Sequence, residues 1–212
     1  TKPTPPEVID AIKKLGGMVK RDKNNAVTHI SFVHVSRAPK ITDAGLVHLK
    51  GLTKLEWLWL QRTKITDAGL VHLKGLKNLE FLGLQGTGIT DAGLVLLKGM
   101  TNLAGLNLGH TKVTDAGLVH LKGMTNLVAL NFDFTKVTDE GVVHLKEMTS
   151  LQAVHLNHTR VSDAGLVHLK GLTDLFKLDL EHTNVTEEGF KQLQQAFPKC
   201  RIYSNYNPGL LR

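Results

Sequence analysis

The phrase Thr-Asp-Ala-Gly-Leu recurs every 24 residues through most of the chain. Its seven copies, of which the last three are slightly altered, begin at Thr42, Thr66, Thr90, Thr114, Thr138, Ser162 and Thr186. Self-similarity at a fixed period of about 20–50 residues indicates stacked structural units that bury their apolar faces against one another. No linker rich in Pro, Gly or Ser interrupts residues 41–196. The sequence therefore predicts one elongated stack rather than separate compact domains.

The first half of each period has the pattern of a short helix. In the first full unit, residues 41–64, Thr42 is suited to the N-cap and Asp43 to complement the positive helix end. Lys50-Gly51 then supplies a cation and a C-terminal stop. The leucines between them recur three residues apart, at Leu46, Leu49 and Leu52. This spacing predicts a helix with one apolar face.

The second half of each period alternates in hydrophobicity, which predicts a short strand. In the first unit Leu58 and Leu60 point to the core, and the residues between and around them point the other way. The buried files expected from this register are Leu58, Leu82, Leu106, Leu130, Val154 and Leu178; Leu60, Leu84, Leu108, Phe132, Leu156 and Leu180; and Ile65, Ile89, Val113, Val137, Val161 and Val185. Because strands pack about 4.8 Å apart and helices about 8–10 Å apart, the strands must line the concave wall.

The stretch Leu55-x-x-Leu58-x-Leu60-x-x-Thr63-x-Ile65 resembles the leucine-rich repeat core L-x-x-L-x-L-x-x-N-x-L. The T-D-A-G-L phrase is similar to a bacterial subtype with 24-residue repeats. This resemblance implies an α/β fold, a right-handed solenoid with a parallel concave β-sheet and convex helices, like the horseshoe of ribonuclease inhibitor. It also implies a binding or scaffolding module rather than a catalyst. Thr replaces the usual ladder Asn here, and a hydroxyl offers fewer hydrogen-bond partners than an amide.

The ends of the chain depart from the repeat, as the outer faces of terminal units must meet water. Residues 1–40 are expected to form an N-terminal cap, with a helix at Pro6–Leu15 and a strand at Ala26–Val35. Residues 41–184 comprise six 24-residue repeats, and residues 185–212 a C-terminal cap. In the C-terminal cap we expect a continued helix file and then a strand or tail, from Phe190, Leu193, Ala196, Phe197 and Ile202.

Composition restricts the compartment and the partner only weakly. Cys200 is the single cysteine, so no intrachain disulfide can form, which slightly favours a reducing, intracellular compartment. The start at Thr1 rather than Met is compatible with the loss of a leader. No apolar run approaches the about 18 residues of a membrane span. The formal charge of +7 would suit an acidic partner, but a lysine-rich solvated face explains it more simply.

Positions that are identical in every copy are explained by stacking, so we expect function where exposed positions differ. The concave columns vary strongly along the chain. They read Trp57, Phe81, Gly105, Ala129, Ala153 and Lys177; Trp59, Gly83, Asn107, Asn131, His155 and Asp179; and Gln61, Gln85, Gly109, Asp133, Asn157 and Glu181. These columns separate into an aromatic zone and a polar zone.

In the aromatic zone, Trp57, Trp59 and Phe81 lie beside glycines that leave a floor with little side chain, at Gly83, Gly105 and Gly109. Aromatic anchors next to open space are typical of a binding hot spot. The alternative is that the N-terminal cap folds over these rings and buries them. Gln61, Gln85 and Asn107 are assigned to the same predicted partner-binding surface.

The polar zone consists of Asn131, Asp133, His155, Asn157, Asp179 and Glu181. Because neighbouring strands are about 4.8 Å apart, Asp133, His155 and Asp179 are placed to converge on a cation or on a basic segment of a partner. Three such residues on a flat sheet favour polar recognition, or ordinary solvation, over a metal. We therefore expect no metal and no cofactor.

Two further columns have structural explanations. The helix column His48, His72, His120, His144 and His168 diverges on a convex face, which favours solvated residues over metal ligands. His158 and His182 are adjacent copies where their strands end, but no metal is predicted there. The lysines at the helix ends, Lys50, Lys74, Lys98, Lys122, Lys146 and Lys170, complement the helix dipoles. No aromatic residues interleave with these lysines, so nucleic-acid binding is not favoured.

No catalytic motif accompanies the repeat: the chain has no G-x-S-x-G, no phosphate-binding glycine loop and no Cys/His signature. The sequence therefore predicts a monomeric, non-enzymatic module that binds a protein or peptide through its concave sheet. Two alternatives stay open. One is a structural spacer or consensus-like scaffold without a ligand, since residues 41–52 and 65–76 are identical. The other is a weak binder of acidic polymers through the lysine rim.

Overall fold

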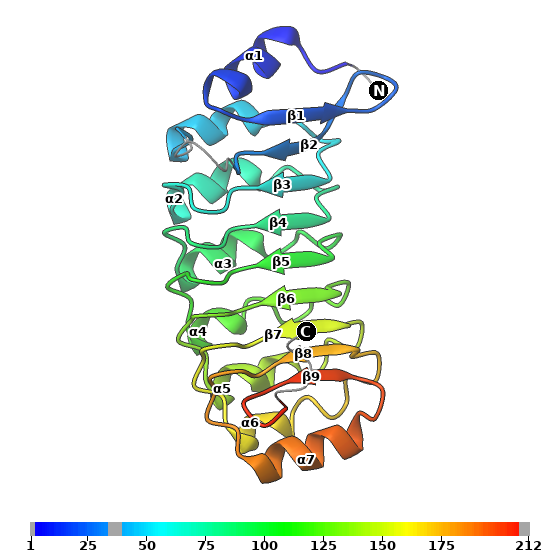
Figure 1. Ribbon diagram of the computed structural model, residues 1–212. Helices are drawn as coiled ribbons and strands as arrows, with labels where there is room; N and C mark the ends of the chain where they lie inside the picture. Colours follow the sequence, from blue (N-terminus) through cyan, green and yellow to red (C-terminus); the bar gives the residue numbers. More distant parts are fainter. Residues whose placement is uncertain (1–2, 34–39, 208–212) are drawn as a thin grey trace.

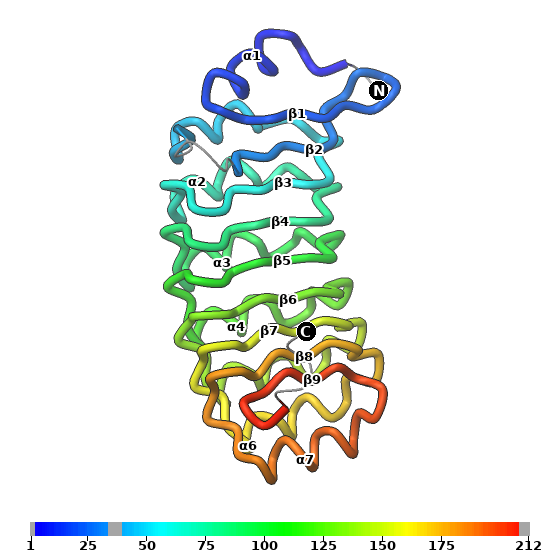
Figure 2. The backbone as a smooth tube through the Cα atoms, in the orientation of Figure 1, coloured from blue at the N-terminus to red at the C-terminus, as the bar shows by residue number. Residues whose placement is uncertain are grey.

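A computed structural model describes residues 3–33 and 40–207, and shows a single stack of coils (Figures 1 and 2). The strands form one sheet whose order follows the chain. The first pair is antiparallel and the following pairs are parallel. The strands are β1 Met18–Arg21, β2 Val27–Ser31, β3 Trp57–Trp59, β4 Phe81–Gly83, β5 Gly105–Asn107, β6 Ala129–Asn131, β7 Ala153–His155, β8 Lys177–Asp179 and β9 Arg201–Tyr203.

The helical halves of the repeats are short and lie together on one face of the sheet (Figure 1). The α-helices are α1 Pro6–Lys14, α2 Asp67–Leu70, α3 Asp91–Leu97, α4 Asp115–Leu118, α5 Asp139–Val142, α6 Asp163–Leu166 and α7 Glu187–Ala196. The 3-10 helices are η1 Asp43–Leu49, η2 Val71–Leu73 and η3 Val143–Leu145. None of the helices in the described part of the chain is long and apolar enough to cross a membrane. The other face of the sheet carries no helix (Figure 1).

The sheet register confirms the predicted alignment of successive coils. Leu58 pairs with Leu82, and Leu82 with Leu106. The residues of all three predicted files are buried, with exposed fractions of 5% or less. Each file therefore runs as a continuous apolar row between the sheet and the helices, which no single coil is large enough to form alone.

The aspartate of the repeated phrase joins one coil to the next. Asp43 accepts hydrogen bonds from the backbone N–H of Thr66 at 2.7 Å and from its hydroxyl at 2.6 Å. Sequence alone predicted only a helix-dipole role for this carboxylate. The same two bonds join Asp67 to Thr90, Asp91 to Thr114, Asp115 to Thr138, Asp139 to Ser162 and Asp163 to Thr186. We call this row of bonds the aspartate ladder.

The aspartate ladder also explains the glycine of the phrase. A methyl group built on Gly117 would collide with Oδ1 of Asp91 from the preceding coil. The helix of one coil thus approaches the ladder carboxylate of the previous coil at a position where no side chain fits. Asp and Gly are therefore required together, one in each of two adjacent coils.

The predicted capping hydrogen bond does not form at Thr42, in the first copy of the repeated phrase. From Thr66 onward, the side chain of each such residue accepts a backbone N–H in the first helical turn. Thr42 makes no such bond, and the element that follows it is the 3-10 helix η1. The residue 24 positions before Asp43 is Val19, so no ladder carboxylate precedes Thr42 to position its hydroxyl.

The threonines at the usual ladder-Asn position close the turn of their own coil. The Thr63 hydroxyl donates to the carbonyl of Leu60 at 2.7 Å, and the Thr111 hydroxyl to that of Leu108 at 2.6 Å. Both threonines are buried. A single donor is enough here because the backbone acceptor lies only three residues earlier.

The two ends differ in part from expectation. The predicted helix at Pro6–Leu15 is observed as α1, which ends at Lys14, and the predicted strand at Ala26–Val35 is observed as the shorter β2, Val27–Ser31, with residues 34–35 outside the described part. The antiparallel strand β1 was not predicted, since it has no copy in the repeat. At the far end, Leu193 and Phe197 are buried and β9 forms, but Ala196 is exposed because the last turn of α7 has no further coil to pack against.

Candidate functional site

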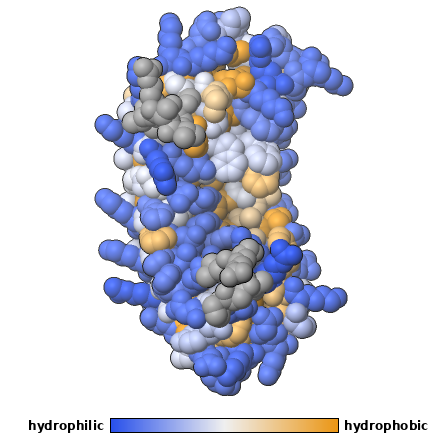
Figure 3. Space-filling model, in the orientation of Figure 1, coloured by the Kyte–Doolittle hydropathy of each residue, from blue (hydrophilic) through white to orange (hydrophobic). Residues whose placement is uncertain are grey.

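The predicted partner-binding residues all lie on the helix-free face of the sheet, and each of them is partly buried. Their columns follow the observed register, in which Trp59 is beside Gly83, and His155 is beside Asn131 and Asp179. Figure 3 shows this face with apolar and weakly polar side chains over the upper half of the sheet and hydrophilic ones along its edges.

The aromatic zone is a packed cluster. The Trp57 and Phe81 ring centroids are 4.1 Å apart, and those of Trp57 and Trp59 are 5.9 Å apart in an edge-to-face arrangement. His29 of β2 stacks on Trp57 at 5.4 Å. The N-terminal cap therefore packs against one ring of the cluster, while Trp59 and Phe81 line a cavity on the open face.

The open floor expected at the glycines is confirmed in part: Gly105 lines the cavity on this face, whereas Gly83 and Gly109 are not among its lining residues. Gln61 and Trp59 lie over Gly83, and the Phe81 ring lies over Gly105. Large neighbouring side chains fold onto a glycine because it presents no Cβ to resist them. At Gly109, an added Cβ atom would lie only 2.8 Å from Oδ1 of Asn131.

The remaining open space is a cavity of about 280 Å³ in the middle of the sheet. It is lined by rings on one side and by amides and an imidazole on the other, among them Trp59, Phe81, Asn107, Ala129, Asn131 and His155. This concave cavity therefore connects the aromatic zone to the polar zone. Apolar walls with a few convergent polar groups are the usual composition of a ligand site.

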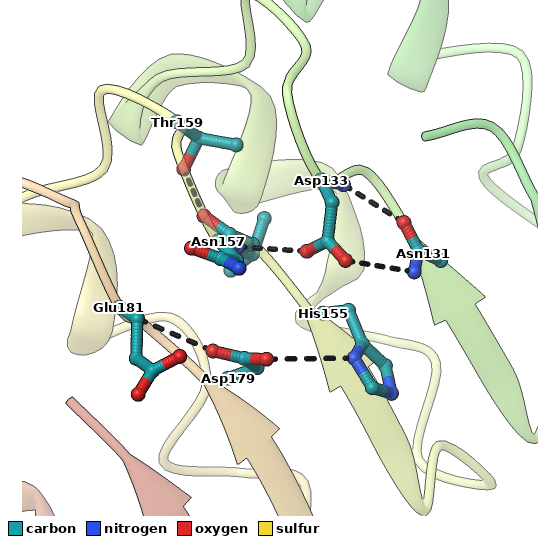
Figure 4. Close-up of polar contacts among 8 residues, drawn as sticks. Asn131, Asp133, His155, Asn157, Thr159, Asp179 and Glu181 are labelled. Carbon is teal, nitrogen blue, oxygen red and sulfur yellow. Dashed lines mark hydrogen bonds and ion pairs between the residues drawn. The ribbon is translucent and has the colours of Figure 1, made fainter. Parts of the chain in front are cut away.

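In the polar zone, hydrogen bonds hold the Asp133 carboxylate (Figure 4). Its Oδ2 accepts from Nδ2 of Asn131 at 3.0 Å, and its Oδ1 accepts from the backbone N–H of Asn157 at 2.9 Å. The Asp133 N–H in turn donates to Oδ1 of Asn131 at 2.8 Å. Burial raises the pKa of Asp133, against the lowering effect of these hydrogen bonds and of His155.

The second carboxylate, Asp179, faces the imidazole (Figure 4). Its Oδ2 lies 3.8 Å from Nδ1 of His155, and its Oδ1 accepts from the backbone N–H of Glu181 at 3.2 Å. Ligand-type atoms of Asp133, His155 and Asp179 all lie within 4.8 Å of one another. The predicted convergence of these three side chains is therefore confirmed, and no other such group occurs in residues 3–33 and 40–207.

One surface feature was missed by sequence reasoning. The rings of His110, Phe134, His158 and His182 stack with successive centroids 4.1 Å apart. All four residues have φ between 54° and 58°, in the left-handed region that non-glycine residues seldom adopt. The sequence does contain a signal for this stack, because a histidine or phenylalanine ring stands at the same position in four consecutive copies. Sequence analysis identified only His158 and His182, as adjacent copies where their strands end.

Comparisons with known proteins agree with this architecture. A leucine-rich repeat family model matches residues 123–145 and 147–169. A search of curated protein sequences found no match. Among solved structures, internalin C2 of Listeria monocytogenes has a TM-score of 0.65 at 20% identity, covering 94% of this chain and 93% of the internalin.

Two further solved structures are longer than this chain. An internalin (inlF) of Listeria monocytogenes has a TM-score of 0.63 at 22% identity, and its match covers 94% of this chain and 55% of the internalin. A leucine-rich repeat protein of Leptospira interrogans has a TM-score of 0.52 at 18% identity, with 74% and 44% covered. The chain thus spans about half the length of the inlF structure. These neighbours confirm the predicted α/β leucine-rich repeat solenoid.

Proposed function

We propose that this leucine-rich repeat protein binds a protein or peptide through the concave face of its sheet, as a non-enzymatic module of the bacterial 24-residue type. The observation that carries the proposal is the cavity of about 280 Å³ between the aromatic and polar zones. A leucine-rich repeat fold is commonly a protein-interaction module, and its extended concave surface suits a partner segment that crosses several strands.

The two zones have different roles in this proposal. Trp59 and Phe81 offer apolar ring surface to a partner side chain that enters the cavity, which is the usual chemistry of a hot spot. Asn107 and Asn131 offer amide donors and acceptors on the cavity wall, and Asp133 and Asp179 add negative charge beside it. The apolar contact supplies affinity and the polar contacts supply selectivity.

The same surface explains why recognition is proposed rather than catalysis or nucleic-acid binding. Of the cavity-lining residues, His155 is the titratable one, and the others are apolar or amide side chains. The carboxylates of Asp133, Asp179 and Glu181 lie on the face that a partner would occupy and would repel a phosphate backbone. A partner with apolar and cationic side chains fits this surface better.

We propose that the module acts as a monomer.

The proposal is tested by comparing a concave variant with a convex control. The concave variant is Trp57→Ala with Trp59→Ala, and the control is Val95→Ala with Val119→Ala on the exposed face of the helical half. Each protein is used to capture partners from its native source, and the captured partner is then titrated by calorimetry. We expect the concave variant to lose about 30-fold or more in affinity, as for hot-spot truncations, and the control to match the unmodified protein.

Circular dichroism and thermal melting accompany the titrations. A folded concave variant with a moderately lowered melting temperature is expected, because the rings are only partly buried but pack against one another and against His29. Equal affinity of the two variants for the partner would refute the proposal. A collapse of stability would place the rings in the core, and a failure to capture any specific partner would favour a structural spacer. Binding that the concave variant retains but salt abolishes would favour the lysine rim.

A further inference from the structure

The cluster of Asp133, His155 and Asp179 contains the donor types of a metal site. It combines one imidazole with two carboxylates, and all three donors lie within 4.8 Å of one another. Zinc bonds to such nitrogen and oxygen donors are about 2.0–2.2 Å long, so two donors on one ion lie roughly 3–4 Å apart. His155 Nδ1 and Asp179 Oδ2 are already 3.8 Å apart. The donor atom of Asp133 belongs to the same group.

The carboxylates keep free acceptor capacity while they are held in place. Each oxygen of Asp133 accepts one hydrogen bond, from Asn131 or from the N–H of Asn157. Since a carboxylate has about four lone-pair sites, each oxygen still offers a lone pair. In Asp179, Oδ1 accepts the Glu181 N–H, which leaves Oδ2 turned toward His155. Hydrogen bonds of this kind orient the ligands of protein metal sites.

The charge around the cluster is also unbalanced. Among the described residues, the basic side chain in contact with these two carboxylates is His155, which lies beside Asp179. The nearest cation on the same strand, Lys177, lies over the Tyr203 ring at 5.6 Å from its centroid. A bound dication would balance the negative charge of the two carboxylates.

We propose that Asp133, His155 and Asp179 bind one divalent transition-metal ion, with zinc as the best fit to a mixed nitrogen and oxygen donor set. His155 also lines the concave cavity. Three protein ligands leave a zinc ion one coordination position for water or an outside donor. This inference does not depend on the proposed partner binding.

The test is calorimetric titration of zinc into protein that has been freed of metal by dialysis against a chelator. We expect one site per chain, weakened at least 10-fold by Asp133→Asn, by Asp179→Asn and by His155→Gln. The matched control is His158→Gln with His182→Gln, which removes the exposed stacked pair and leaves the cluster intact. The control protein should bind zinc as the unmodified chain does.

Circular dichroism establishes that each variant is folded, and two separate aspartate variants keep the test valid if one of them is not. The absence of a zinc site in the unmodified protein would overturn the proposal. So would a site that the His158 and His182 control abolishes, or one that all three cluster variants retain. Each of these results would leave the partner-binding test unaffected, because that test changes none of the three cluster residues.

Discussion

Substituting Gly117 by Ala should cost less stability when Asp91 is absent. In the unmodified chain, the new methyl group meets Oδ1 of Asp91, which already accepts the Thr114 N–H at 2.7 Å, and Cδ1 of Leu94. Overpacking of this kind typically costs about 1–3 kcal/mol. In an Asp91→Ala background the oxygen is gone and the contact with Leu94 remains. The helix preference of alanine over glycine, about 0.5–1 kcal/mol, then offsets much of the remaining cost.

Asp91→Ala alone removes the two ladder bonds to Thr114, each 2.7 Å long. Hydrogen bonds to charged groups contribute about 1.5–3 kcal/mol each. Because this carboxylate is only partly buried, solvent screening reduces the combined loss to about 2–4 kcal/mol. The loss caused by Gly117→Ala should therefore be smaller in the Asp91→Ala background than in the unmodified chain, where the methyl group meets both Asp91 and Leu94.

Urea unfolding of the four proteins, followed by circular dichroism, measures this cycle directly. Gly75→Ala serves as the control, because a methyl group there meets no atom within 4 Å. Its effect on the free energy of unfolding should be the same with and without Asp91. Equal destabilisation by Gly117→Ala in both backgrounds would show that the carboxylate does not require the glycine.

Three further predictions concern the core and the turns. Leu106→Ala, in the middle of a buried file, should lower the free energy of unfolding by about 2–5 kcal/mol in urea titrations; a loss below about 1 kcal/mol would contradict continuous packing. Thr111→Val should cost about 1–2 kcal/mol by leaving the buried Leu108 carbonyl without its hydroxyl donor, whereas Thr111→Ser should retain most of the stability, and equal losses would refute the hydrogen-bond role. Burial raises the pKa of the Cys200 thiol from 9.0 to about 11. Between these values the unfolded chain loses the thiol proton and the folded chain keeps it, so this contribution to stability falls as pH rises. Melting from pH 8 to 11 should show that fall, Cys200→Ser should reduce it, and identical slopes for the two proteins would contradict the assignment.

Much of the fold could be predicted because equal positions in successive copies become neighbours in space. The pairing of Leu58 with Leu82 follows directly from the 24-residue period. The aspartate ladder could not be predicted in this way, since Thr42 and Asp43 also satisfy the pattern of an ordinary helix start. Strand β1 has no copy in the repeat, so periodicity carries no information about it.

The candidate site shows the same division. The columns of Asp133, His155 and Asp179 were correctly placed side by side, because parallel register determines which residues are neighbours. The position of the cavity depends instead on side-chain conformation, since the Phe81 ring lies against Gly105 and both residues line the cavity. Alternation along a strand specifies the face of a residue but not the direction in which a large ring leans.

The two tryptophans of the chain, Trp57 and Trp59, both lie in the proposed binding surface. Replacing them with 5-fluorotryptophan therefore gives fluorine resonances that report on the concave face alone. Recognition through that face predicts that these resonances shift or broaden as the captured partner approaches saturation, and that they return when the partner is displaced. A saturated complex in which both resonances remain unchanged would show that the partner binds elsewhere on the molecule.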